Sequence, residues 1–203
     1  MPRPRTVSDA EILGAAAWVI GEVGPDRLTL GDVGRRVGLA PATVVQRFGS
    51  RRGLLLALAD HDVDAVPARL RTAAAAPGSV LDALVSVLVD SASQIDSPAR
   101  FAHHLAFLLK DLEDPEFQAS TRRYGSGVSA AITTVLAAAA DRGELAGDVD
   151  ELAHLVHVVY NGALVTWGMA PDGEPADLVG RRLRQVLAPY RARGDAGSTA
   201  EVG

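Results

Sequence analysis

The segment 28–58 constrains the fold of this chain more than any other stretch. Thr29 precedes a short apolar pattern and has an acidic residue three positions later, which is the arrangement of a helix N-cap. Gly38 suits a left-handed helix stop, and Pro41 suits the first position of a new helix, where its missing N–H leaves no bond unmade. The Gly-Ser pair at 49–50 ends this second helix and caps a third. The segment therefore predicts two short helices joined by a tight turn, with another helix directly behind them.

The apolar positions of the two short helices indicate a helix-turn-helix. Val33 and Val37 lie one turn apart on one face of the first helix, and Val44 and Phe48 form the buried face of the second. The small Gly34 lets the two helices cross closely at a steep angle. The outward positions of the second helix are then Ala42, Thr43, Gln46 and Arg47. A helix placed in this way enters the DNA major groove through its N-terminal half, although a two-helix turn alone is also ordinary core packing.

Helical periodicity continues through the rest of the chain, and no segment alternates as a strand does. Pro67 must kink or break the long segment that contains it, because proline removes a hydrogen bond and clashes with the previous turn. The sequence predicts an all-α protein of about nine helices. The expected helices are 9–23, 30–37, 41–48, 51–76, 80–95, 96–112, 116–141, about 150–170 and 176–191.

The net charge of −5 is divided unevenly along the chain. Residues 1–56 carry a charge of +3 and the remainder carries −8. A basic N-terminal part followed by an acidic remainder is typical of a small DNA-contacting module. Arg3 and Arg5 lie on an N-terminal arm, which either reaches phosphates or a minor groove or is an ordinary solvated tail.

Several features of the composition predict a cytoplasmic protein with no membrane partner. Cysteine is absent, which excludes disulfides and thiolate metal sites. The basic start has no apolar h-region behind it, and no apolar run approaches the roughly 20 residues that span a bilayer.

Residues 9–58 resemble the DNA-binding region of TetR-family regulators. The resemblance rests on Leu28-Thr-Leu-x-x-Val-Gly-x-x-Val-Gly-Leu and on Thr43-Val-Val-Gln-Arg-Phe-Gly-Ser-Arg-Arg-Gly-Leu-Leu. It implies a three-helix DNA-binding domain at 1–50 and a ligand-binding and dimerisation domain at 51–193. In that family the last two helices, here about 150–170 and 176–191, pair with a second subunit as a four-helix bundle. The remaining tail, 194–203, is small and polar and is expected to be disordered.

The resemblance also implies which residues contact DNA. Thr29 would bond a phosphate, and Arg51 would grip a second one where the family usually has Lys. Arg47 would bond guanine and Gln46 adenine, each contributing roughly 1–3 kcal/mol of discrimination. Val45 departs from the family, which commonly has Tyr at this position. The full predicted DNA-binding set is Thr29, Ala42, Thr43, Gln46, Arg47 and Arg51.

The C-terminal part is expected to hold a pocket for a small apolar effector. Aromatic side chains with occasional polar tips gather in the helices expected at 96–112, 116–141 and about 150–170, although each of them alone also suits an ordinary helix core. The predicted ligand-binding residues are Phe101, His104, Phe107, Leu108, Tyr124, Val128, Asn161 and Trp167.

These observations favour a regulator over an enzyme. The sequence contains no Ser/His/Asp arrangement, no paired carboxylates in an apolar setting and no phosphate loop, so no catalytic residue and no cofactor is predicted. His154 and His157 lie one turn apart but lack a third ligand, and no metal site is predicted. The leading hypothesis is a homodimeric, ligand-responsive repressor on a palindromic operator in double-stranded DNA, with activation left open. An all-α enzyme and a helical protein–protein adaptor remain the alternatives.

Overall fold

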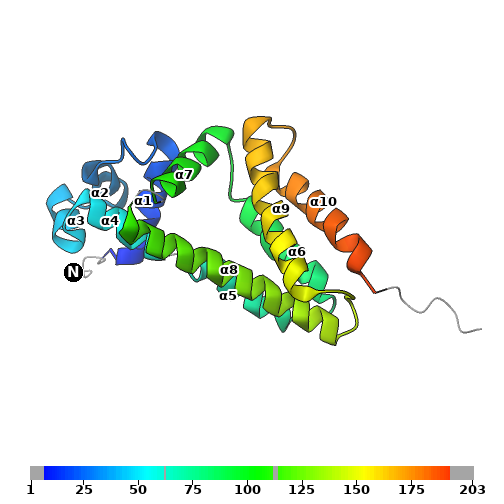
Figure 1. Ribbon diagram of the computed structural model, residues 1–203. Coiled ribbons are helices and arrows are strands. Elements are labelled where there is room, and N and C mark those ends of the chain that lie inside the picture. The colour runs from blue at the N-terminus through cyan, green and yellow to red at the C-terminus, as the bar shows by residue number, and fades with distance from the viewer. Residues whose placement is uncertain (1–6, 62, 112–113, 193–203) are drawn as a thin grey trace, which may run out of the picture.

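The computed structural model describes residues 7–61, 63–111 and 114–192, and this part of the chain is helical with no strands, which confirms the predicted all-α class (Figure 1). The helices are α1 (Asp9–Val23), α2 (Leu30–Val37), α3 (Pro41–Phe48), α4 (Arg51–His61), α5 (Ala65–Ala74), α6 (Val80–Ala92), α7 (Pro98–Asp111), α8 (Pro115–Asp141), α9 (Val149–Met169) and α10 (Pro175–Leu187), followed by the 3-10 turn η1 (Ala188–Tyr190). The predicted arm with Arg3 and Arg5 and the predicted tail 194–203 lie outside the described residues.

The helices α1–α4, called the head below, share one apolar core. Ser8 opens α1 with a complete capping box, in which the Ser8 hydroxyl accepts from the Glu11 N–H and the Glu11 carboxylate accepts from the Ser8 N–H. Gly24 closes the helix at a positive φ of 81°. The core of the head contains Ile12, Ala16, Ile20, Leu28, Val33, Val44, Leu54, Leu55 and Leu58. Because α4 supplies three of these side chains, it packs with the first three helices as well as leading out of them.

The segment 51–76 is two helices, which makes ten α-helices in the described part of the chain where about nine were expected. The break lies at Val63 and Asp64, between α4 and α5, and not at Pro67 itself. Pro67 lies in the first turn of α5, where its lack of an N–H costs nothing. A continuous helix would press the proline ring against the carbonyl of Val63, four residues earlier. The chain therefore breaks one turn before the proline.

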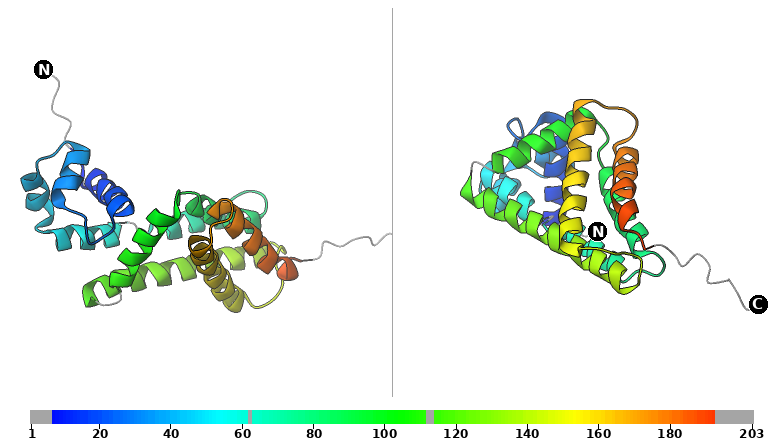
Figure 2. Two further views of the ribbon diagram at one scale, coloured as in Figure 1. Left: turned by 90° about the horizontal axis from the view of Figure 1, so that it is seen from above. Right: turned by 45° about the vertical axis from the view of Figure 1, so that its right-hand side comes forward.

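The helices α5–α10, called the body below, surround a second and larger core. The long helix α8 runs alongside α5, and α6, α9 and α10 pack together at the end of the molecule farthest from the head (Figures 1 and 2). Glu144 fastens the start of α6 from the loop after α8. Its carboxylate accepts from the Ser79 hydroxyl at 2.7 Å and from the Val80 and Leu81 backbone N–H groups at 2.8 and 3.2 Å. This carboxylate therefore satisfies N–H groups that a helix start leaves free.

The head and the body are joined through α7 and α8. His103 of α7 bonds the Gly21 carbonyl at the end of α1 through Nδ1 at 2.7 Å. Phe117 of α8 is buried in the head's own core and meets Phe107 of α7 edge to face, with 6.2 Å between ring centroids. Arg52 of α4 pairs with Asp114 at 2.7 Å and also with Glu116. The body therefore contacts α1 and α4, two helices of the head.

No helix in the described part of the chain is long and apolar enough to cross a membrane.

Candidate functional site

The crossing of α2 and α3 has the geometry of a helix-turn-helix. A Cβ added at Gly34 would lie 2.6 Å from the Leu39 carbonyl oxygen, so only glycine allows the turn to fold this tightly against α2. The Leu39 N–H donates to the Gly34 carbonyl at 2.8 Å, and Gly38 adopts the left-handed conformation with φ of 72°. Val33 and Val44 are fully buried between the helices. The turn predicted from the sequence is confirmed in detail.

The outer face of α3 is exposed in the chain, as its predicted role requires. Ala42, Gln46 and Arg47 are exposed and Thr43 is half-buried. Val45 is 43% exposed, an unusual position for an aliphatic side chain with no partner surface. The helix projects from the head at the end farthest from α9 and α10 (Figure 1). This face is therefore open along the length of the helix.

The Arg47 side chain does not point outward from α3, contrary to what the sequence pattern predicts. Its Nε lies 2.7 Å from a carboxylate oxygen of Asp9, and its Nη1 donates to the Val7 carbonyl at 2.5 Å. The guanidinium thus folds back onto the start of α1. No sequence pattern predicted this contact, because Asp9 and Arg47 are far apart along the chain and meet only in the folded head.

Arg51 and Thr29 are also engaged within the head. Arg51 Nε donates to the Leu28 carbonyl at 2.9 Å, and its Nη2 donates to the Pro25 carbonyl, so the side chain ties the α1–α2 loop to the start of α4. The Thr29 hydroxyl accepts from the Asp32 N–H at 3.1 Å and donates to the Asp32 carboxylate at 2.5 Å. The Thr29 hydroxyl, with Arg35 nearby, lowers the pKa of Asp32. The N-cap predicted at Thr29 is confirmed, and the structural role of Arg51 was missed.

Comparison with known proteins agrees with this geometry. A family model described as bacterial regulatory proteins, tetR family, matches residues 12–58, which span the helix-turn-helix and most of α1 and α4. Residues 12–58 are therefore similar to the tetR family of bacterial regulatory proteins. The chain is similar to YezE of Bacillus subtilis (strain 168), called an uncharacterized HTH-type transcriptional regulator, with 24% identity over 167 residues, 81% of this chain and 86% of that one.

Solved structures share the fold over nearly the whole chain. SmeT, the repressor of the Stenotrophomonas maltophilia multidrug efflux pump SmeDEF, has a TM-score of 0.70 and 22% identity, covering 97% of both chains. A SmeT–triclosan complex has a TM-score of 0.71 and 20% identity, covering 95% of this chain and 97% of that one. A putative transcriptional regulator from Saccharomonospora viridis, in complex with choline, has a TM-score of 0.75 and 16% identity, covering 91% and 98%.

The structure contains a cavity of about 530 Å³, within the usual range for ligand sites. Its walls come from α1 and α4 of the head and from α5, α6, α7 and α8 of the body. Four of the residues predicted to bind ligand line it, namely His104, Phe107, Leu108 and Tyr124. Ile20 of α1 and Leu58 of α4 form part of the same wall. The cavity therefore lies against the helices that carry the helix-turn-helix.

The other four predicted ligand residues lie away from this cavity. Phe101 packs edge-on against Trp167, whose Nε1 donates to the Gly173 carbonyl at 2.9 Å, so both serve the α7–α9 contact. Val128 is 3% exposed in the body core. Asn161 is on the exposed face of α9. Helical spacing indicates which residues share a face but not which neighbouring helix that face meets, and these four meet other neighbours.

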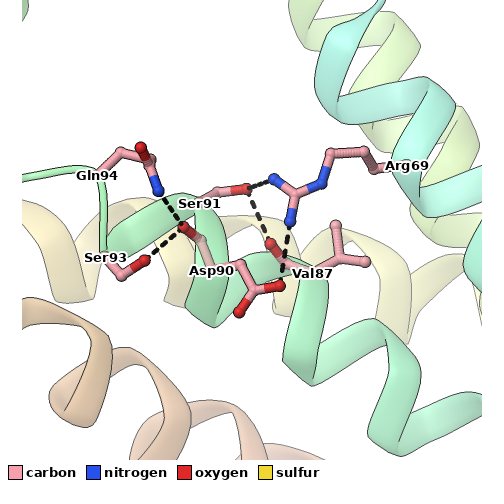
Figure 3. Close-up of polar contacts among 6 residues, drawn as sticks. All are labelled: Arg69, Val87, Asp90, Ser91, Ser93 and Gln94. Carbon is pink, nitrogen blue, oxygen red and sulfur yellow. Dashed lines mark hydrogen bonds and ion pairs between the residues drawn. The ribbon is translucent and has the colours of Figure 1, made fainter.

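The polar side of the cavity was missed by sequence reasoning. Arg69 of α5, Ser91 of α6 and Gln94 in the turn after α6 line it. The Arg69 guanidinium donates to Ser91 Oγ at 3.3 Å and to the Asp90 carboxylate at 3.2 Å (Figure 3). These residues resemble an ordinary solvated helix face in the sequence. Only the break before α5, which turns that helix against α6 and α8, brings them to the cavity.

The titratable groups around the cavity are held mostly neutral. Burial lowers the pKa of His104, and the nearby positive groups of Arg100 and His103 lower it further, so the imidazole is neutral at pH 7. Burial raises the pKa of Tyr160 on α9 to about 12, with Tyr124 adding to the effect and Arg69 opposing it. Of the described residues that line the cavity, Arg69 alone carries a formal charge at pH 7.

Proposed function

We propose that the protein is a homodimeric repressor that binds a palindromic operator and is released by a small effector held in the cavity of the body. The open face of α3, on a helix-turn-helix fixed by the Gly34–Leu39 contact, is the observation that carries the DNA-binding part. We retain 1–50 as the DNA-binding domain and 51–193 as the effector-binding and dimerisation domain, with α4 shared between them.

Base readout is assigned to the exposed residues of α3. Gln46 suits adenine, Ala42 and Thr43 suit thymine methyl groups, and Arg47 suits guanine once it leaves Asp9. Thr29 and Arg51 are assigned to the phosphates that flank the groove. For Arg51 this contact uses the guanidinium hydrogens that do not bond the Leu28 and Pro25 carbonyls.

The dimer interface is assigned to α9 and α10. Val158, Val165 and Met169 are 52%, 38% and 83% exposed and lie on one face of α9. Gly162 lies on the same face, and a Cβ added there meets nothing within 4 Å. An apolar face of this kind is covered in a stable protein, and pairing with a second copy places two α3 helices about a two-fold axis, as a palindrome requires.

Effector release is assigned to the shared wall of the cavity. An effector that binds better when α1 and α4 have shifted relative to α7 and α8 favours that state of the head, and the two heads then no longer match the operator. The triclosan bound to SmeT and the choline bound to the Saccharomonospora viridis protein support a ligand site in this fold.

The test is selection of DNA from a random duplex pool with the full chain. We expect recovery of an inverted repeat, and loss of that enrichment in Arg47→Ala. Arg122→Ala, at an exposed position on α8, is the matched control and is expected to select the same repeat. A folded protein that enriches no sequence at low salt overturns the proposal, and so does recovery of a single, unrepeated half-site by a dimer.

A further inference from the structure

The polar side of the cavity carries a positive charge that the rest of the lining does not balance. Arg69 projects from α5 toward the end of α6, where its guanidinium bonds Ser91 and Asp90, and Gln94 bonds the Asp90 carbonyl (Figure 3). Asp90 does not line the cavity, and no carboxylate is found among the described residues that do. The neighbouring carboxylate of Asp60, which accepts from the Ser120 hydroxyl, is paired with Arg123. The cavity therefore favours a negative group over a positive one.

The Arg69 guanidinium has donors left for a ligand. Its bonds to Ser91 and Asp90, at 3.3 and 3.2 Å, use two of its five N–H groups. Both are longer than the roughly 2.7–2.9 Å of a strong charge-assisted bond. Asp90 is 60% exposed, so water can solvate its carboxylate when a ligand takes over part of the guanidinium. Gln94, whose amide lies 3.5 Å from the Asp90 carbonyl, adds a side-chain amide to the same rim.

The remaining wall is largely apolar. The cavity is faced from four different helices by Ile20, Leu58, Val66, Phe107 and Leu108. An occupant that fills it must bury hydrocarbon or an aromatic ring against them, and each buried CH₂ tightens binding by about fourfold.

Resting on the proposed function, we propose that the effector is an apolar carboxylic acid in its anionic form, its carboxylate on Arg69 and its hydrocarbon against α1, α4 and α7. The charge distinguishes it from the cationic choline bound by the Saccharomonospora viridis relative. Arg69 sets the preference for the anion, and the apolar wall next to α1 and α4 couples occupancy to the head.

The test compares three probes of one shape and different charge. Calorimetric titration of the full chain uses 1-naphthaleneacetate, 2-(1-naphthyl)ethanol and 2-(1-naphthyl)ethylammonium. We expect the carboxylate to bind roughly 10- to 100-fold more tightly than the alcohol, since a hydrogen bond to a charged group contributes this much, and the ammonium to bind most weakly. Arg69→Gln is expected to bind the carboxylate no better than the alcohol, with the alcohol's own affinity unchanged.

Two further variants keep the result interpretable. Arg69→Lys retains the charge without the planar fork and is expected to restore part of the preference. Arg71→Gln, exposed on the same helix and absent from the cavity wall, is expected to behave as the unmodified chain.

Three outcomes overturn the assignment: equal affinities for the three probes, a carboxylate preference that survives in Arg69→Gln, or no binding of any probe by protein that still binds its operator. If the unmodified chain binds no operator, the proposed function itself is wrong. Failure of the effector assignment and failure of the proposed function are therefore distinguishable.

Discussion

Arg47 and Asp9 form an ion pair, 2.7 Å between Nε and the carboxylate oxygen, that joins the recognition helix α3 to the first turn of α1. The arginine assigned to guanine is therefore held by a carboxylate of the same head before DNA arrives. When Arg47 binds a base it must give up the Asp9 carboxylate. Its net contribution to the free energy of DNA binding is therefore smaller than the new contact alone suggests.

Replacement of either partner separates these contributions. Arg47→Ala is expected to weaken operator binding by about 1–3 kcal/mol, the usual contribution of a base-reading arginine. Asp9→Asn removes the competing charge and one negative group near the phosphates, so we expect operator binding to tighten by a few fold at low salt and less at high salt. Fluorescence anisotropy on the selected operator measures both. Weaker binding by Asp9→Asn would mean that Asp9 holds Arg47 in its reading position.

Gly34→Ala is expected to destabilise the head. The added methyl group meets the Leu39 carbonyl oxygen at 2.6 Å, and relieving this contact moves the turn, at a cost of about 1–3 kcal/mol. Gly31→Ala is the matched control on the same helix, because its Cβ meets only atoms at 3.6 Å or beyond. We expect this control to be stabilised by roughly 0.5–1 kcal/mol, as alanine is in helices. Thermal unfolding followed by circular dichroism gives both signs, and equal melting temperatures for the two variants would contradict the close contact.

Glu144 is expected to make stability depend on pH. Burial opposes the charged form, but bonds from the Val80 N–H, the Ser79 hydroxyl and the Leu81 N–H outweigh it and lower the pKa of this carboxyl. Its contribution is therefore present above the ordinary value of 4.5 and is lost as the pH falls through the lower value in the folded protein. Glu144→Gln should lose about 1–3 kcal/mol at pH 7 in urea unfolding. The difference in unfolding free energy between this variant and the unmodified chain should shrink as the pH falls below the ordinary carboxyl pKa of 4.5.

The control for this pH dependence is Glu151→Gln, at an exposed position in the first turn of α9. We expect a loss of only a few tenths of a kcal/mol there, from the helix dipole. A difference for Glu144→Gln that stays constant from pH 7 to pH 3 would contradict the hydrogen-bonded carboxylate.

Val165→Glu and Met169→Glu are expected to shift the protein from dimer to monomer. Each places a charge on the apolar face of α9, and two copies bring like charges together across the two-fold axis. Leu109→Glu, at a position on α7 that is 53% exposed, is the control and should leave the mass unchanged. Sedimentation equilibrium measures the mass, and dimers that persist with both α9 variants would place the interface elsewhere.

The sequence predicted the elements that depend on local chemistry. The cap at Thr29, the left-handed Gly38 and Pro41 at a helix start each act over a few residues, so their pattern is readable in the chain. The tight crossing at Gly34 followed from the same pattern. Half of the predicted ligand residues reached the cavity, because α7 and the first part of α8 do face it.

Long-range partners were not predictable in this way. The contacts of Arg47 with Asp9 and of Arg51 with the α1–α2 loop depend on how helices dock, which no local spacing encodes. Arg69 lines the cavity because of the orientation of α5. That orientation depends on the break at Val63 and Asp64, and the proline alone did not predict the exact position of the break. The sequence indicated that a break occurs, and packing decided where the next helix points.

The contact between Gly34 and the Leu39 carbonyl has a consequence for how such a protein evolves and is engineered. A crossing that tolerates no added methyl group leaves little room for α2 and α3 to shift against each other, so we expect these two helices to move together. Recognition of the operator and its effector-controlled release are then expected to depend on different residues. Substitutions on the outer face of α3 should redirect the protein to new promoters with its inducer unchanged, and substitutions in the cavity should change the inducer with its promoters unchanged.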